Sequence, residues 1–151
     1  MIEDKLKQLN ISLPDAPKPV AAYIPALKIG NLVYTSGQIP ISEGKLMYSG
    51  KVGKDISESE AVKAAELCAI NCLSAIKGVI GKLDDIDRIV KLTVFVSSSE
   101  GFTGQPKVAN GASELLEKIF GDKGKHVRSA VGVSELPLNS TVEIEMIVQL
   151  S

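Results

Sequence analysis

The chain has 151 residues, of which 44% are hydrophobic and 4% aromatic, and its formal net charge at pH 7 is -1. This length fits one domain with a sizeable core, and the hydrophobic content excludes a disordered chain. The near-neutral charge and few aromatics argue against nucleic-acid binding. Apolar runs too short for a bilayer and the lack of a secretory-signal pattern predict a cytoplasmic protein without a membrane partner.

The two cysteines, Cys68 and Cys72, lie four positions apart in a stretch with helical spacing. Thiols at that spacing share one helix face but have poor geometry for a disulfide, and no set of histidines or further cysteines accompanies them as zinc ligands. We interpret them as small core residues in a reducing compartment. We expect neither a metal site nor an organic cofactor.

The N-terminal third predicts a short helix followed by β-structure. Apolar residues at positions 2, 6 and 9 have helical spacing, and the proline-rich residues 13–19 then break regular structure. Strands are predicted at 27–29 and 32–36 on either side of the turn Gly30-Asn31. A second turn and a short strand at 46–48 follow, and then an exposed loop.

Two longer helices and a strand occupy the middle of the chain. A capping box of Ser57 and Glu60 begins a helix that is predicted to reach Lys77, with Gly78 and Gly81 as its stop. A polar connection at 84–87 precedes a strand at 89–96, which is rich in β-branched residues. A second helix is predicted from Pro106 to about Phe120, although it contains Gly111.

The C-terminal tract from His126 to Glu145 predicts two strands joined by a Pro-Leu-Asn-Ser turn. Arg128 lies in the first of these strands among apolar residues. A buried guanidinium requires an anionic partner, and its planar donors suit a carboxylate. The tract therefore indicates a site for a small acid, although an edge-strand arginine paired with a surface carboxylate fits the pattern equally well.

Glu143 and Glu145 share one face of the last strand, where either a solvated face or a general base is consistent with the pattern. If the two strands form a hairpin centred near Leu138, Val133 lies opposite Glu143. Arg128 then lies about five residues further along, on the order of 17 Å away. A site that uses both Arg128 and Glu143 would need two subunits.

Other residues are weaker candidates. Tyr23 fits either a pocket lid or packing, Gly37 permits close approach of a ligand to the backbone, and Asn110 fits a helix surface. His126 is interpreted as a pocket-rim or surface residue. A loose basic cluster gives RNA binding only weak support, because acidic residues interrupt it and no stacking aromatics accompany it. The cluster consists of Lys118, Lys123, Lys125, His126 and Arg128.

The element order is strands, helix, strand, helix, strands, which predicts an α+β fold with helices on one sheet face. The uncovered face favours a homo-oligomer. Three motifs together resemble the Rid family, also called YjgF or reactive intermediate deaminases, from about Pro19 to Leu150. They are residues 30–40 (GNLVYTSGQIP), residues 91–96 (KLTVFV), and the Arg-Ser at 128–129 with the Glu-Ile-Glu at 143–145.

The resemblance implies one chorismate-mutase-like domain over residues 1–151, with residues 1–18 as an N-terminal extension. It implies a mixed sheet with two main helices on one face, a homotrimer, and a site in each intersubunit cleft. The implied reaction converts 2-enamine or 2-imine acids to 2-keto acids and ammonia without a cofactor. Arg128 would bind the substrate carboxylate and Glu143 would position the attacking water.

The family's tyrosine, strand-end glycine and helix asparagine match Tyr23, Gly37 and Asn110. The chain departs from the family where Ala130 replaces a usual cysteine and Gly132 a frequent glutamate. Its segments 42–55 and 97–107 are longer and extra residues precede Pro19, so it resembles a longer, less characterised branch. These departures leave a second interpretation open, a trimer that binds small carboxylates without turnover. A third, an RNA-cleaving or translation-inhibiting protein, is disfavoured by the near-neutral charge and the few aromatics.

Overall fold

A five-stranded mixed sheet forms the centre of the computed structural model, which describes residues 1–19 and 21–151. The strands lie in the order β1-β2-β7-β5-β6; their bounds are Ala26–Ile29 for β1, Leu32–Thr35 for β2, Val142–Leu150 for β7, Ile86–Ser97 for β5 and Val127–Val133 for β6. Neighbouring strands are antiparallel except β5 and β6, which are parallel. Two short strands, β3 (Ile41–Ser42) and β4 (Lys45–Leu46), form a separate ribbon.

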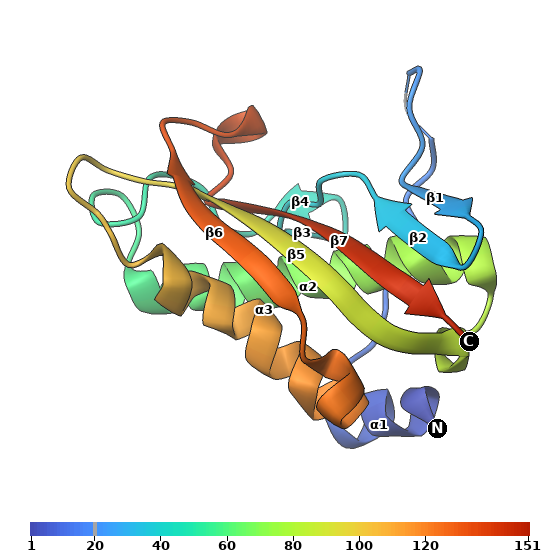
Figure 1. The fold of residues 1–151 in the computed structure, drawn as a ribbon. Coiled ribbons are helices and arrows are strands. Elements are labelled where there is room, and N and C mark those ends of the chain that lie inside the picture. The colour runs from blue at the N-terminus through green and yellow to red at the C-terminus, as the bar shows by residue number, and fades with distance from the viewer. Residues whose placement is uncertain (20) are drawn as a thin grey trace.

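Helices α2 (Glu58–Ile80) and α3 (Gln105–Phe120) cover one face of this sheet, and α1 (Ile2–Gln8) packs at their side (Figure 1). Three 3-10 turns complete the chain, η1 (Leu83–Asp85), η2 (Gly121–Gly124) and η3 (Pro137–Asn139). The predicted α+β fold with two main helices on a mixed sheet is confirmed. The core lies between the helices and the inward side chains of β7 and β5, such as Ile144 and Leu92.

The predicted elements differ from the structure mainly at their ends. The strand predicted at 89–96 begins at Ile86, because the end of β7 offers it pairing partners, and the strand predicted at 46–48 is the two-residue β4. The capping box of Ser57 and Glu60 is present, but Gly78 does not end α2, which continues to Ile80 with Gly81 as its cap. A Cβ atom at Gly78 would lie 2.5 Å from the Cβ of Ala16, so this glycine makes room for a neighbouring segment.

The predicted C-terminal hairpin is wrong. Strand β6 pairs in parallel with β5, and β5 lies between β6 and β7. The connection between β6 and β7 is too long for a tight turn, and it includes η3, in which Leu138 and Asn139 have φ values of 58° and 60°. Local turn residues suggested a hairpin, whereas pairing with β5 lets the β5–α3–β6 segment fold as one unit with α3 packed against the sheet.

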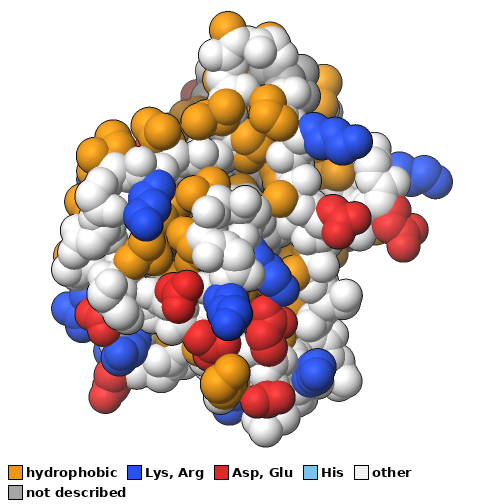
Figure 2. All heavy atoms as spheres, turned by 90° about the vertical axis from the view of Figure 1, so that its right-hand side faces the viewer, with side chains coloured by type: hydrophobic (Ala, Val, Ile, Leu, Met, Phe, Trp, Pro, Cys, Tyr) orange, Lys and Arg blue, Asp and Glu red, His pale blue; other side chains and the backbone are white. Residues whose placement is uncertain are grey.

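The second face of the sheet carries no helix within the part of the chain that is described. Exposed hydrophobic side chains lie on it in β1, β2 and β6; they are Leu27, Ile29, Tyr34, Val127 and Val131. Figure 2, a view from the β1–β2 side, shows hydrophobic side chains along the upper edge of the molecule and acidic ones lower down. Apolar surface of this kind usually marks an interface, so the expectation of a homo-oligomer stays a prediction.

Gly111 in α3 lies where the two main helices approach each other most closely. A Cβ atom built on it would overlap the backbone carbonyl of Val62 in α2. This contact explains why α3 tolerates a residue of low helix propensity on its buried side.

We predict that Gly111→Ala lowers the free energy of unfolding by about 1–3 kcal/mol, because overpacking against a backbone atom outweighs the gain in helix propensity. Denaturant unfolding monitored by circular dichroism measures the change. Lys107→Ala, at an exposed position of the same helix, should leave stability within about 0.5 kcal/mol of wild type. A Gly111→Ala variant as stable as wild type would contradict the close approach.

Candidate functional site

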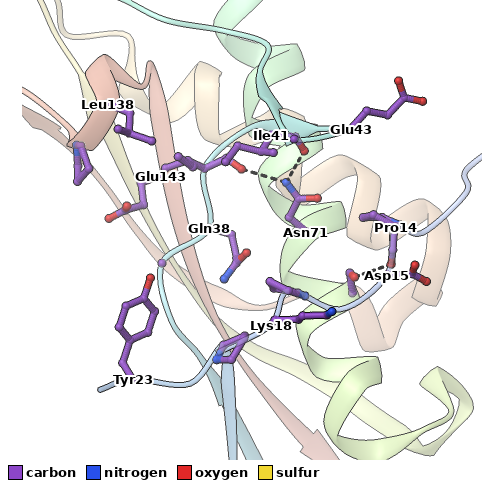
Figure 3. Close-up of a pocket in the computed structure, with 17 residues that line it drawn as sticks. Pro14, Asp15, Lys18, Tyr23, Gln38, Ile41, Glu43, Asn71, Leu138 and Glu143 are labelled. Carbon is purple, nitrogen blue, oxygen red and sulfur yellow. Dashed lines mark hydrogen bonds between the residues drawn. The ribbon is translucent and has the colours of Figure 1, made fainter. Parts of the chain in front are cut away.

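A cavity of about 620 Å³ opens beside Glu143 on β7 (Figure 3). Its lining includes Tyr23, Gly37 and Gln38, which come from the segment before β1 and the segment after β2. Two backbone hydrogen bonds fix the second segment against β7: the Gln38 amide donates to the Ile144 carbonyl (2.8 Å), and the Ile144 amide donates to the Gln38 carbonyl (2.9 Å). The structure therefore brings together three of the predicted site residues, Tyr23, Gly37 and Glu143.

Gly37 is required by the position of the Glu143 side chain. A Cβ atom at residue 37 would lie 2.8 Å from the Glu143 carboxyl carbon and 2.9 Å from its Oε2 atom. No real side chain fits at that distance unless the carboxylate moves. We expected Gly37 to let a ligand approach the backbone closely. In the structure it lets the Glu143 side chain do so.

The Glu143 carboxyl group has a raised pKa. Burial among the walls of the cavity is the main cause, and the negative charge of Glu145 on the same strand face adds to it. A carboxylate with a raised pKa is a somewhat stronger base than an exposed glutamate, and it can act as a general base toward a water molecule that attacks a bound electrophile. Tyr23 lies across the cavity from Glu143 and is 59% exposed, so its ring stands at the cavity mouth (Figure 3).

Arg128 belongs to a second group of residues, at the edge of the sheet beside α3. Its Nη1 atom donates to Asn110 Oδ1 (2.9 Å) and Ser113 Oγ (3.0 Å), and its Nη2 atom donates to the Pro106 carbonyl (3.2 Å). No carboxylate of residues 1–19 or 21–151 forms an ion pair with it. The interpretation as a surface ion pair is therefore wrong for this chain, and neutral acceptors orient the cation.

His126 continues this hydrogen-bonded group. Its Nδ1 atom is 2.6 Å from the Gly124 carbonyl, and its Nε2 atom is 2.9 Å from Ser113 Oγ. Burial is the main cause that lowers the pKa of His126, and the charge of Arg128 lowers it further, against the Gly124 hydrogen bond, which raises it. A neutral ring donates through Nδ1 and accepts from Ser113 through Nε2, so Ser113 joins His126 to Arg128. His126 and Arg128 line one hollow of about 320 Å³.

Ala130 follows Arg128 by two residues on the same face of β6 and packs against the core. Gly132, two residues further on, leaves space for a side chain of α3. A Cβ atom there would lie 2.7 Å from Gln105 Nε2, which donates to Ser98 Oγ (3.2 Å) and the Phe102 carbonyl (2.8 Å). The amide of Gln105 thus occupies space beside the strand that a larger residue at 132 would need.

Arg128 and Glu143 do not meet within one chain. Arg128 is opposite Leu92 of β5 on the helix side of the sheet, whereas Glu143 is opposite Phe95 on the side without helices. The sequence led us to expect no contact between them within one chain, and the structure has none, but the reason differs. The hairpin register behind that expectation is wrong, and the two side chains lie on opposite faces with β5 between their strands.

Comparison with known proteins gives a family for this arrangement. Residues 3–150 match the family model described as "YjgF/chorismate_mutase-like, putative endoribonuclease". The chain belongs to the YjgF/RutC (Rid) family. It is 40% identical to "Protein TCP17" of Trypanosoma cruzi over 147 residues, 97% of this chain and 92% of that protein.

Two further relatives place the chain within the YjgF/RutC family. It is 32% identical over 139 residues to a protein of Dermatophagoides farinae named "2-iminobutanoate/2-iminopropanoate deaminase", covering 91% of this chain and 93% of that one. The crystal structure of Atu1372 from Agrobacterium tumefaciens, a protein of unknown function, superposes with a TM-score of 0.93 at 44% identity, covering 99% and 92% of the two chains. The chorismate-mutase-like fold is thereby confirmed.

Several residues that shape these two groups were not predicted from the sequence. Ser113 looks like an ordinary helix serine, and Gln38 like a turn residue after a strand. Asn71, by contrast, could have been identified, because it is a polar residue on the apolar face of α2. A buried amide needs hydrogen-bond partners, so its position predicts that other segments contact the helix there. Among the described residues no cluster could hold a metal ion, and no helix is long and apolar enough to cross a membrane.

We predict that Glu143→Gln raises the midpoint of thermal unfolding at neutral pH. The pKa of Glu143 is higher in the folded protein than in the unfolded chain. Between these two pKa values the folded protein binds a proton that the unfolded chain has lost, so the free energy of unfolding falls as the pH rises through this range. The glutamine removes this loss, so the difference between variant and wild type should grow from about pH 4 to about pH 7.

Differential scanning calorimetry across this range measures the effect. Glu114→Gln, which changes an exposed carboxylate on α3, is the matched control. Equal midpoints for Glu143→Gln and wild type at every pH would show that the Glu143 carboxylate is not destabilised by its surroundings.

Proposed function

We propose that this protein hydrolyses 2-imino acids, and the enamines in equilibrium with them, to 2-keto acids and ammonia. The observation that carries the proposal is Arg128, a guanidinium oriented by three neutral acceptors and left without a carboxylate partner among the described residues. Such a cation is suited to a substrate carboxylate. The deaminase name of the Dermatophagoides relative, which is 32% identical to this chain, supports the same reaction.

Glu143 supplies the base that the reaction needs. In a 2-imino acid, C2 carries the C=N bond and is attacked by water. The Glu143 carboxylate accepts a proton from that water as the new C–O bond forms, and it passes this proton to the nitrogen, which gives a carbinolamine. The hydroxyl proton of the carbinolamine then moves to the nitrogen through Glu143, the C–N bond breaks, and ammonia leaves as the C2 carbonyl forms. The sum is imine plus water giving ketone plus ammonia, with no redox change.

The site is composed of two subunits of a homotrimer. Arg128 and Glu143 lie on opposite faces of the sheet in one chain, so one small substrate contacts both only if they come from different chains. The apolar open face, with Leu27, Ile29 and Val131 exposed, supplies the interface. In this arrangement Asn110 and Ser113 position Arg128, and Tyr23 and Gly37 of the other subunit border the reacting carbon.

A second function, binding of small carboxylates without turnover, is favoured by the residues that follow Arg128 on the same strand face. Ala130 has no polar side-chain atom, and the Gln105 amide occupies the space beside Gly132, so neither position supplies a group that could take part in the reaction. RNA cleavage, which the family description names, is less consistent with the chain as a whole. Its formal net charge is -1 and 4% of its residues are aromatic, so it offers RNA neither a general electrostatic attraction nor a surface of stacking side chains.

We predict that the protein accelerates formation of 2-keto acid from imines generated in place by an amino-acid oxidase. Arg128→Ala should lower kcat/KM by about 10- to 100-fold, because a charge-assisted hydrogen bond to the substrate carboxylate is lost. Lys107→Ala, an exposed cation on α3, should leave the rate unchanged. Acceleration that survives in Arg128→Ala refutes the role of Arg128. Binding of 2-keto acids without acceleration by wild type identifies the non-catalytic trimer.

We predict that activity returns when Arg128→Ala and Glu143→Gln chains are co-expressed and assemble together. Each mixed trimer contains one cleft in which both residues are wild type. Random mixing of equal amounts should therefore restore about a quarter of the wild-type rate. Each variant alone should keep only its own reduced rate, and light scattering should give the mass of a trimer. A mixture no more active than its two components, or a monomeric mass, would rule out the shared site.

A further inference from the structure

The cavity beside Glu143 continues well beyond that residue, toward the N-terminal part of the chain. Its far end is formed by the segment Pro14–Lys18, which we call the N-terminal strap, together with Asn71 and Ser74 of α2 (Figure 3). The strap follows α1 and passes along α2 before the chain reaches β1 (Figure 1). The mechanism above uses only the end of the cavity that holds Glu143 and Tyr23.

Contacts with α2 hold the strap in place. Ser74 Oγ, which is 1% exposed as a residue, donates to the Pro14 carbonyl at 2.6 Å. One turn further along α2, Gly78 faces Ala16 so closely that a Cβ atom on the glycine would lie 2.5 Å from the alanine Cβ. Upstream, α1 is anchored by its buried Leu6 and by the Ile2 amide, which donates to Asp84 Oδ1 at 2.7 Å.

The opposite wall is held by the same helix. Asn71 Nδ2 donates to the carbonyls of Ile39 (2.9 Å) and Ile41 (3.0 Å), which fixes the segment between β2 and β3. Asn71 and Ser74 are the buried polar side chains of α2 other than its thiols, and each one fixes a wall of the cavity. Hydrogen bonds from buried side chains of α2 therefore hold both walls in place.

The far end offers apolar surface from two proline rings and two branched aliphatic side chains, which are Pro14, Pro17, Ile39 and Ile41. Asp15, Lys18 and Glu43 lie among them, and Leu138 adds a further apolar side chain near Glu143 (Figure 3). A volume of about 620 Å³ lies in the range of pockets that enclose drug-sized ligands, so an acid of three or four carbons would leave most of it unfilled.

We propose that the N-terminal strap is a specificity-determining wall, and that the site takes 2-imino acids with bulky apolar side chains, such as those derived from leucine or phenylalanine. The inference rests on the proposed function: the reacting carbon lies beside Glu143, and the side chain extends between the strap and the Ile39–Ile41 segment. An apolar side chain gains from burial there, whereas the methyl group of the alanine-derived imine does not reach the strap.

The test displaces the strap without changing any residue at the reacting end. Gly78→Ala forces Ala16 away from α2, and Ser74→Ala removes the hydrogen bond to Pro14. For each variant kcat/KM is measured with the leucine-derived and the alanine-derived imine. The leucine-derived value should fall about tenfold, the range expected when apolar contacts in a pocket are lost. The alanine-derived value should stay within about twofold.

The matched control is the swap Gly78→Ala with Ala16→Gly, which removes the overlapping methyl group and should restore the leucine-derived rate. If both single variants keep the wild-type ratio of leucine- to alanine-derived kcat/KM, or lose both activities equally, the strap is not a specificity wall. That result would leave the proposed deaminase intact, because wild type still turns over imines.

If wild type turns over no imine, a binding measurement tests the strap as a specificity wall independently of the proposed hydrolysis. Calorimetry then compares binding of the leucine-derived 2-keto acid with binding of pyruvate. Tighter binding of the larger acid, weakened about tenfold by Gly78→Ala and restored by the swap, supports the strap as a wall in a non-catalytic protein. Equal binding of both acids, or binding of neither, overturns the inference together with the proposed hydrolysis.

Discussion

The close approach of α2 to the sheet is the constraint on which both the cavity and Glu143 depend. The helix presents small side chains to β7, and two of these are thiols: Cys68 Sγ donates to the Val142 carbonyl (3.6 Å) and Cys72 Sγ to the Ile144 carbonyl (3.3 Å). Burial raises the pKa of Cys72 to about 12 and raises that of Cys68 as well, so both thiols stay protonated and donate. They contact the residues on either side of Glu143, on the opposite face of the strand from its carboxylate.

The same helix places the polar groups that shape the cavity. Asn71 and Ser74 continue the face that carries the thiols, and they bind backbone carbonyls of two segments that are distant in sequence. A buried amide or hydroxyl without a hydrogen-bond partner would be strongly unfavourable. Asn71 and Ser74 therefore stabilise the positions of the segment between β2 and β3 and of the strap. The pocket walls are thus consequences of core packing, although both walls are loops.

Electrostatics separate the two groups of site residues. Glu143 is left beside another carboxylate and partly desolvated, and Arg128 is held by neutral acceptors, with a neutral His126 behind Ser113. Each chain therefore keeps a partly buried carboxylate on one sheet face and, on the other, a cation without an ion-pair partner among the described residues. Burial and the charge of Glu145 disfavour the ionised form of Glu143, whereas the neutral acceptors around Arg128 orient its positive charge without compensating it.

Local patterns were sufficient to predict the helices and most of the strands, and they marked Arg128 and Glu143 as candidate site residues. Helical spacing, the Ser57–Glu60 capping box and an arginine within an apolar strand depend only on neighbouring residues. The pairing of β6 with β5, the clustering of Asn110 and Ser113 around Arg128, and the strap packed on Gly78 were decided by tertiary structure. These contacts join residues far apart in the chain, and their energies depend on which surfaces remain to be buried once the helices have packed, which no local pattern contains.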